Sequence, residues 1–271
     1  VNAIPTPTLI SNDADNSFCA GISVTFTAGG GTEFNFRVNG ISKQTGAIST
    51  YTTNTLQNGD IVDVIVTSAT GCPATSSGIP NTVYDLPNPQ ITGAAAVCGL
   101  PTATFYSVID VLGHTYAWSV TGGAISSGQG TNTILVDWST VGAGTIGIIE
   151  TVTATGCFNN ASKSITKAEA SVGGNLSGTK IVCAGSTSGT LTLNNYVGTI
   201  TKWQRSNNQI DWVDIAFTGG SYLSAALTET TYFRAIVQSG ACNAVASTTA
   251  TITVNPLPTL VINQPAPVCA P

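Results

Sequence analysis

Pairs of cysteines at a nearly fixed spacing organise this sequence of 271 residues. The first cysteines of the pattern are Cys19, Cys98 and Cys183, and each is followed by a second cysteine, at Cys72, Cys157 and Cys242. The first cysteines recur with a period of about 80–85 residues, which is the size of a small β domain. The spacing therefore predicts three domains in tandem.

The expected domain boundaries follow from this period. They are 1–86, 87–167 and 168–256 for the three complete units, and 257–271 for a linker and the start of a fourth, truncated unit. Cys269 falls one further period after Cys183 and would be the first cysteine of that fourth unit. The odd number of cysteines is therefore expected if this sequence is a piece of a longer array of repeats.

Alternating prolines mark two of the predicted junctions. The stretches 83–89 (V-Y-D-L-P-N-P) and 254–258 (V-N-P-L-P) favour extended chain, because alternate prolines hold φ at about −65°. They predict short, semi-rigid spacers. The stretch 165–174 between the second and third units has no proline and is expected to bend more easily.

Short strand patterns fill each unit. Examples are 34–38 (F-N-F-R-V), 133–138 (T-I-L-V-D-W) and 232–237 (Y-F-R-A-I-V), which are rich in β-branched and aromatic residues and bounded by turn residues. No stretch keeps a helical periodicity for more than a turn or two. The predicted fold class is all-β, with immunoglobulin-like β-sandwiches arranged end to end.

Aromatic residues test the strand register. Trp118 and Trp203 follow the first cysteine of their units at the same spacing, and Phe36 takes a slightly earlier place in the shorter first unit. This position suits the third strand of an immunoglobulin-like sandwich, whose inward aromatic packs in the core. Trp138 and Trp212 come later in their units and are the candidates for surface contact, although core or edge packing is the favoured interpretation for both.

Composition restricts the kinds of function. Only 8% of residues are charged and the formal net charge is −5, which argues against nucleic acid as a partner. Regularly placed cysteines in so polar a chain indicate a secreted, extracellular or cell-surface protein. No apolar run approaches the ~20 residues that a membrane helix needs, so no membrane insertion is expected. The sequence shows no signal peptide, as expected for an internal piece of a secreted protein.

Catalytic and metal-binding patterns are weak. His114 is the only histidine and is expected on a surface turn, so neither a Ser-His-Asp relay nor a multi-histidine metal site can be built. The stretch 173–180 (G-G-N-L-S-G-T-K) resembles a phosphate loop, but Lys180 comes one place too late. Asp13 and Asp15 could hold Ca²⁺ loosely, although an exposed turn is favoured. The chain is predicted to be no enzyme and to need no cofactor.

Several motifs in the chain are typical of a known class of repeats: Tyr116–Gly123 (Y-A-W-S-V-T-G-G), Trp203–Ser206 (W-Q-R-S) with Asp211-Trp212, the V-C-x-G openings and the T-A-T-G-C endings. Through these motifs the chain resembles the Ig-like and PKD-like repeats of giant Bacteroidetes surface proteins. The resemblance covers essentially the whole chain and identifies the middle unit as PKD-like and the outer two as Ig-like. It implies type IX secretion and a stalk or filament outside the cell, in a class that includes gliding-motility adhesins.

The residues leave the cysteine pairing open. One scheme pairs Cys19–Cys72, Cys98–Cys157 and Cys183–Cys242 within units; others pair neighbouring units, as Cys19–Cys157 with Cys98–Cys242, or Cys72–Cys98 across a linker. Pairing within units is slightly favoured because it makes each unit self-sufficient, each bond contributing about 4 kcal/mol in the chain-entropy model. The objection is geometric: immunoglobulin topology places the two cysteines of a unit at opposite ends, and a disulfide needs Cα atoms within ~7 Å.

The function expected from these features is non-catalytic. The chain would be a structural repeat segment of a cell-surface adhesin or filament, whose partners are the neighbouring repeats of the same long chain. A different class of function is a carbohydrate-binding module that binds a surface polysaccharide through Trp138 or Trp212. Other cell-surface proteins are a further expected class of partner. A third is an accessory region of a secreted hydrolase.

Overall fold

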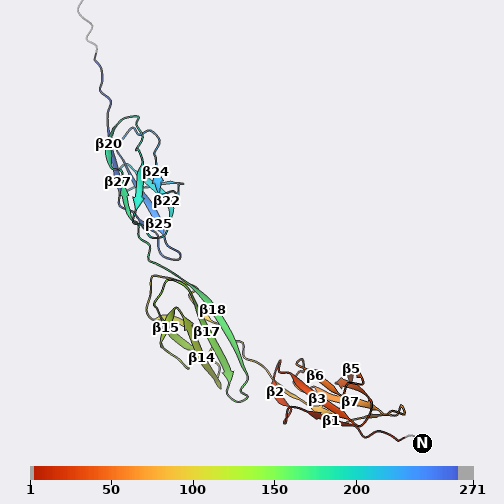
Figure 1. The fold of residues 1–271 in the computed structure, drawn as a ribbon. Coiled ribbons are helices and arrows are strands. Elements are labelled where there is room, and N and C mark those ends of the chain that lie inside the picture. The colour runs from red at the N-terminus through yellow and green to blue at the C-terminus, as the bar shows by residue number, and fades with distance from the viewer. Residues whose placement is uncertain (1–2, 262–271) are drawn as a thin grey trace, which may run out of the picture.

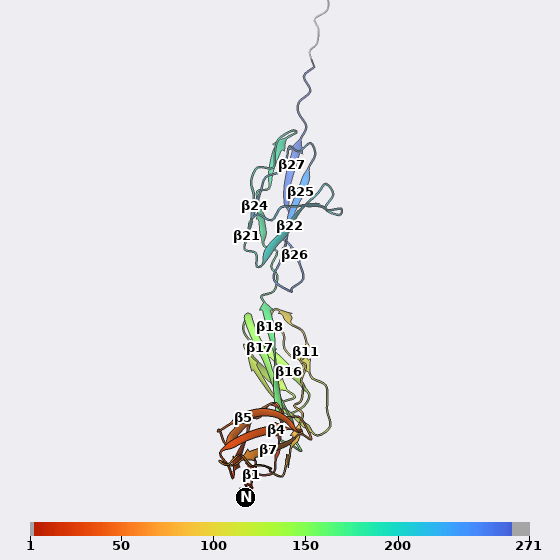
Figure 2. The same cartoon turned by 90° about the vertical axis from the view of Figure 1, so that its right-hand side faces the viewer.

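The computed structural model describes residues 3–261, and throughout this range the regular structure consists of β-strands. Figures 1 and 2 show three units that follow one another along the chain, each with its own strands. Three separate hydrophobic cores lie at residues 18–83, 97–165 and 176–252. The fold is therefore a row of β-sandwiches, as expected. Cys269 and most of 257–271 lie outside the described residues.

The second unit shows the architecture most completely. Its two sheets have the orders β11-β13-β16-β15 and β12-β18-β17-β14, which is an immunoglobulin-like sandwich whose first strand is divided between the sheets. The strands are β11 (Thr92–Gly93), β12 (Ala96–Cys98), β13 (Thr104–Ser107), β14 (His114–Thr121), β15 (Gly123–Ser127), β16 (Thr133–Trp138), β17 (Gly142–Val152) and β18 (Phe158–Ala168).

The first unit has sheets of order β1-β3-β6 and β5-β4-β7-β8, with β9 beside β7 and a separate pair β10-β2. Its strands are β1 (Thr8–Ser11), β2 (Ser17–Cys19), β3 (Val24–Gly29), β4 (Glu33–Val38), β5 (Ile41–Gly46), β6 (Thr50–Thr53), β7 (Ile61–Thr67), β8 (Pro73–Thr75), β9 (Ile79–Pro80) and β10 (Thr82–Tyr84).

The third unit has sheets of order β19-β21-β24 and β20-β27-β25-β22-β23, with β26 beside β25. Its strands are β19 (Asn175–Ser177), β20 (Lys180–Cys183), β21 (Leu191–Asn194), β22 (Thr199–Ser206), β23 (Val213–Ile215), β24 (Ser221–Tyr222), β25 (Thr231–Gln238), β26 (Val245–Ala246) and β27 (Ala250–Asn255).

Alternation of buried and exposed residues explains why these segments form strands. In β25 every second side chain, from Thr231 to Val237, is buried. A strand places successive side chains on opposite faces, so this alternation gives each sheet one face for the core and one for solvent.

The core aromatics occupy equivalent strands in the three units. Phe36 on β4, Trp118 on β14 and Trp203 on β22 are 0%, 4% and 0% exposed. Trp118 Nε1 donates a hydrogen bond to the Thr131 carbonyl at 2.8 Å, and Trp203 Nε1 donates to the Gly219 carbonyl at 3.0 Å. Each indole is thus buried without leaving its polar nitrogen unpaired.

Trp138 is 3% exposed and belongs to the second core, which confirms core packing as the favoured interpretation and makes the alternative of surface contact wrong. It ends β16, where Ile134, Val136 and Trp138 alternate onto the inner face. The Lys167 ammonium lies 4.9 Å from the ring centroid and donates a hydrogen bond to the Gly122 carbonyl at 2.9 Å. Trp138 is therefore not available for contact with a ligand.

Candidate functional site: the stapled junctions

A short parallel strand pair fixes the first cysteine of every unit. β2 pairs with β10, β12 with β18 and β20 with β27, in each case parallel. In these registers the first cysteines Cys19, Cys98 and Cys183 lie opposite Tyr84, Ala168 and Asn255, the last residues of the final strands. The first cysteine therefore lies at the downstream end of its unit, where the chain leaves toward the next unit.

The second cysteine of every unit lies in a turn at the opposite, upstream end. Cys157 lies in the turn between β17 and β18, and the Val152 N–H donates a hydrogen bond to its carbonyl at 2.8 Å. Cys72 follows β7, and Cys242 follows β25. The strand β18 has 11 residues, so at ~3.3 Å per residue it separates Cys157 from Ala168 and its neighbour Cys98 by roughly 35 Å.

The slightly favoured pairing within units is therefore wrong in this structure. A disulfide needs Cα atoms within ~7 Å, and the two cysteines of one unit are at opposite ends of a sandwich. Cys19 is instead bonded to Cys157 with Cα atoms 5.6 Å apart, and Cys98 is bonded to Cys242 with Cα atoms 4.8 Å apart. Each bond joins the downstream end of one unit to the upstream end of the next. We call such a disulfide between consecutive units a staple.

The two remaining cysteines of the described range, Cys72 and Cys183, are unpaired. The alternative bond between Cys72 and Cys98 is not formed either, since Cys98 is bonded to Cys242. Cys183 is exposed and Cys72 is partly buried.

At the first junction, side chains of the second unit hold the proline-rich linker. Asn159 Nδ2 donates a hydrogen bond to the Pro87 carbonyl at 3.0 Å. Ile22, Leu86 and Phe158 line an apolar hollow of about 340 Å³ beside the disulfide. Residues of both units and of the linker thus contact one another around the bond.

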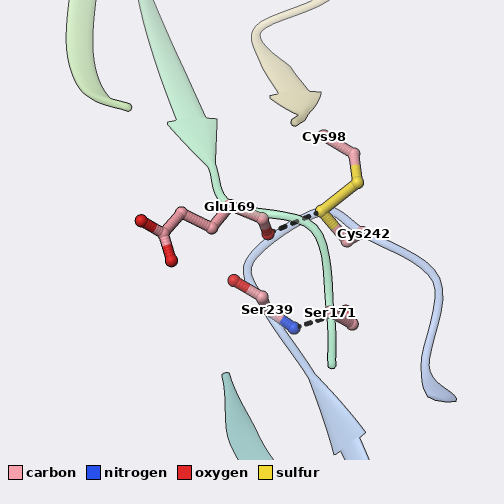
Figure 3. Close-up of a disulfide and its surroundings, with 5 residues drawn as sticks. All are labelled: Cys98, Glu169, Ser171, Ser239 and Cys242. Carbon is pink, nitrogen blue, oxygen red and sulfur yellow. Dashed lines mark hydrogen bonds between the residues drawn. A yellow bond between two sulfur atoms is a disulfide. The ribbon is translucent and has the colours of Figure 1, made fainter. Parts of the chain in front are cut away.

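At the second junction two polar contacts lie beside the disulfide, as Figure 3 shows. The Ser239 N–H donates a hydrogen bond to Ser171 Oγ at 2.9 Å, which joins the linker to the third unit. The Glu169 carbonyl oxygen lies 3.1 Å from Cys242 Sγ. This is a polar contact and not a hydrogen bond, because a sulfur in a disulfide carries no proton to donate.

Both bonds are shielded on one side. Cys157 is 0% exposed and Cys242 is 2% exposed. Thiol–disulfide exchange requires a thiolate to reach a sulfur atom, so attack on these bonds is directed to the other cysteine of each pair, Cys19, which is partly buried, and Cys98, which is exposed.

The other predicted site residues lie apart from the junction disulfides. Asp13 and Asp15 both accept a hydrogen bond from the Ser17 N–H, at 3.0 and 3.1 Å, and so stabilise a turn. His114 is not on an exposed turn: its Nδ1 lies 2.6 Å from Oε1 of buried Glu150. Within residues 3–261 no group of three or more His, Cys, Asp and Glu side chains is placed to hold a metal ion.

Trp212 remains partly exposed at the surface of the third unit. The Arg234 guanidinium lies 3.9 Å from the centroid of its ring. Arg234 Nε also donates a hydrogen bond to Gln204 Oε1 at 2.7 Å. One face of this indole is therefore covered by a cation.

Two protein families match parts of the chain. Residues 85–166 match the family described as a PKD-like domain, and residues 172–256 match a domain of unknown function (DUF8696). The fold and the PKD-like match define the class: the chain is an immunoglobulin-like repeat protein of tandem β-sandwiches. A comparison with curated proteins finds no match. No helix within residues 3–261 is long and apolar enough to cross a membrane.

Several solved multidomain structures are similar over most of the chain. Three N-terminal domains of the Hoc outer capsid protein of bacteriophage RB49 are 15% identical, covering 94% of this chain and 100% of that one with a TM-score of 0.41. Extracellular domains 3–5 of Drosophila OTK are 8% identical, covering 88% and 93% with a TM-score of 0.41. A three-domain titin fragment is 10% identical, covering 94% and 100% with a TM-score of 0.39.

Proposed function

We propose that this chain is a non-catalytic structural segment of an extracellular adhesin or filament. The observation that carries the proposal is that both junctions between consecutive sandwiches are crossed by a disulfide. The resemblance to Bacteroidetes repeats supports a gliding-motility or adhesion stalk exported by type IX secretion. Its partners would then be the neighbouring repeats. The disulfides support a location outside the cell, where such bonds persist.

The two disulfides limit how the units can move and how far the chain can extend. Each junction has two covalent connections, the linker and the disulfide, so the units cannot swivel freely about a single strand of chain. The bonds also shorten the covalent route along the molecule. With both bonds intact, the shortest route from residue 1 to residue 271 contains about 110 residues, so extension stops at roughly 360–400 Å.

Single-molecule stretching between the two ends of the chain tests this proposal. The oxidised protein should stop at that length, and the reduced protein should extend to roughly 890–980 Å, the reach of all 271 residues. The Cys19→Ser, Cys98→Ser double variant, stretched without reductant, is the matched control and should behave as the reduced protein does. Equal extension of oxidised and reduced protein would contradict the proposal.

A second candidate function is carbohydrate binding by the third unit. The observation in its favour is the partly exposed Trp212, near a polar hollow of about 320 Å³ lined by residues such as Arg205, Asn208 and Asp211. A glycan array on the fragment separates the two candidates. The structural proposal predicts no specific hit, whereas a hit lost in Trp212→Ala and kept in Ile210→Ala would favour the binding module.

A further inference from the structure

We propose that Cys72 and Cys183 are the open halves of two further staples of the same kind. Cys183 would bond the second cysteine of the repeat that follows the third unit. Cys72 would bond the first cysteine of a repeat that precedes the first unit. This inference rests on the proposed structural function and extends it to covalent bonds outside the described part of the chain.

Cys183 occupies the same position in its unit as Cys19 and Cys98, the two first cysteines that are bonded. It ends β20 opposite Asn255, and the next residue, Ala184, donates its N–H to the Asn255 carbonyl at 2.9 Å. The same bond follows Cys19, from Ala20 to Tyr84 at 2.8 Å, and Cys98, from Gly99 to Ala168 at 2.8 Å. In the first and second units this first cysteine, which lies beside the point where the chain leaves the unit, is bonded to the next unit.

The position of Cys72 is that of bonded Cys157. Both end a T-G-C turn whose glycine has a positive φ, +82° at Gly71 and +71° at Gly156. The Ser68 N–H donates to the Cys72 carbonyl at 2.9 Å, as Val152 does to Cys157 at 2.8 Å. Cys72 thus lies at the upstream end of its unit with the backbone geometry of a stapled cysteine.

The two cysteines are not placed to bond each other within one molecule. Cys72 belongs to the first unit and Cys183 to the third, and Figures 1 and 2 show the second unit between them. The pattern of bonded cysteines therefore favours a neighbouring repeat of the same class as the bonding partner of each of these two cysteines.

The sequence locates the expected partner of Cys183. Val268-Cys269-Ala270 repeats the opening of a unit, and the spacing from first to second cysteine is the same in the second and third units. The partner should therefore lie about 59 residues beyond Cys269. Cys269 itself lies outside the described residues and enters only as sequence.

Bond formation requires an oxidant of the disulfide class, such as oxidised glutathione or a dithiol oxidase. The Cys183 thiolate attacks a sulfur of that disulfide and releases one thiolate. The partner cysteine then attacks the mixed disulfide and releases the second. The two protein thiols lose two electrons and two protons, and the oxidant leaves as two thiols.

The test is thiol alkylation of the full-length protein from its native compartment, under denaturing conditions without reduction, followed by non-reducing peptide mapping. The inference predicts no alkylation at Cys72 or Cys183, and a Cys183 peptide linked to the second cysteine of the unit that Cys269 opens. Alkylated Cys72 and Cys183 with Cys98–Cys242 intact would overturn the inference and leave the proposed function standing. A Cys183 peptide linked to Cys72 of a second copy would also overturn it.

Matched variants of the full-length protein give a second readout. Cys98→Ser should expose one new thiol, at Cys242. Cys183→Ser should likewise expose one new thiol, on a peptide from outside residues 1–271. If Cys183→Ser exposes none, the inference is wrong. If Cys98→Ser exposes none, the proposed stapled array fails as well.

Discussion

Cys98 is bonded to Cys242 across the second junction, with Cα atoms 4.8 Å apart, although 144 residues separate them in the sequence. Cys98 lies beside Ala168, where the second unit ends, and Cys242 lies in a turn of the third unit. The bond therefore runs alongside the linker. It gives this junction, which has no proline between residues 165 and 174, a restraint that the linker alone does not supply.

Removing this bond should loosen the array without disturbing the sandwiches. The intact fragment should have a radius of gyration well above the ~18 Å of a compact globule of its length. Cys98→Ser should lower that radius, because bent arrangements become populated, while circular dichroism stays unchanged. The control is Cys183→Ser, whose thiol has no partner in the described chain. Identical scattering from the two variants would show that the linker alone sets the stiffness.

Gly240 lies where the turn of the third unit approaches the second unit. Its φ is +50°, and an added Cβ would lie 2.7 Å from the Cβ of Ala168. Gly240→Ala should therefore cost about 1–2 kcal/mol in backbone strain and also push the units apart. We expect slower formation of Cys98–Cys242 from reduced protein in a glutathione redox buffer.

The matched control for this substitution is Gly156→Ala in the turn before Cys157. Its φ is +71°, but an added Cβ would meet no atom within 4 Å. Gly156→Ala therefore introduces the same kind of backbone strain but no clash with another unit. Equal rates of Cys98–Cys242 formation in the two variants would contradict a close junction at Gly240.

Trp118 should be a main determinant of the stability of the second unit. Trp118→Ala removes a buried indole and its hydrogen bond to Thr131, and should cost about 3–5 kcal/mol. Trp212→Ala, at the surface, should cost no more than about 1 kcal/mol through the lost contact with Arg234. Urea unfolding followed by circular dichroism measures both. A small effect of Trp118→Ala would show that the core is assigned wrongly.

Alkaline pH should unfold the second unit through its buried tyrosines. Burial raises the pKa of Tyr106 and also that of Tyr116. The folded state therefore favours the neutral phenols. Their stabilisation is complete below the ordinary tyrosine pKa of about 10 and is lost as pH rises through the higher folded-state value.

The variant Tyr106→Phe tests this pH dependence. It removes one buried ionisable group and should move the alkaline unfolding midpoint to higher pH, as followed by circular dichroism after the free thiols are alkylated. Tyr196→Phe, at a residue that is 38% exposed, is the control and should leave the midpoint in place. An unchanged midpoint in Tyr106→Phe would refute the role of this hydroxyl.

Much of the fold could be predicted because it depends on local pattern. The cysteine period indicated tandem units, and the spacing to Trp118 and Trp203 placed two indoles that prove to be buried. The late position of Trp138 in its unit left surface contact open as an alternative to core packing. The alternation of Ile134, Val136 and Trp138 was the signal that would have placed it inside.

The cysteine pairing could not be decided from spacing because it depends on which end of a sandwich each cysteine occupies. That information lies in the parallel pairing of β12 with β18, in which Cys98 lies opposite Ala168. Two segments about 70 residues apart meet there, and no local pattern reveals their register.

Non-reducing peptide mapping of the oxidised 271-residue chain tests most directly whether consecutive sandwiches are covalently stapled. Free thiols are blocked before digestion, so that pairs cannot exchange. Peptides that link Cys19 to Cys157 and Cys98 to Cys242 are expected. Peptides that link Cys98 to Cys157, within one unit, would contradict stapling between consecutive units.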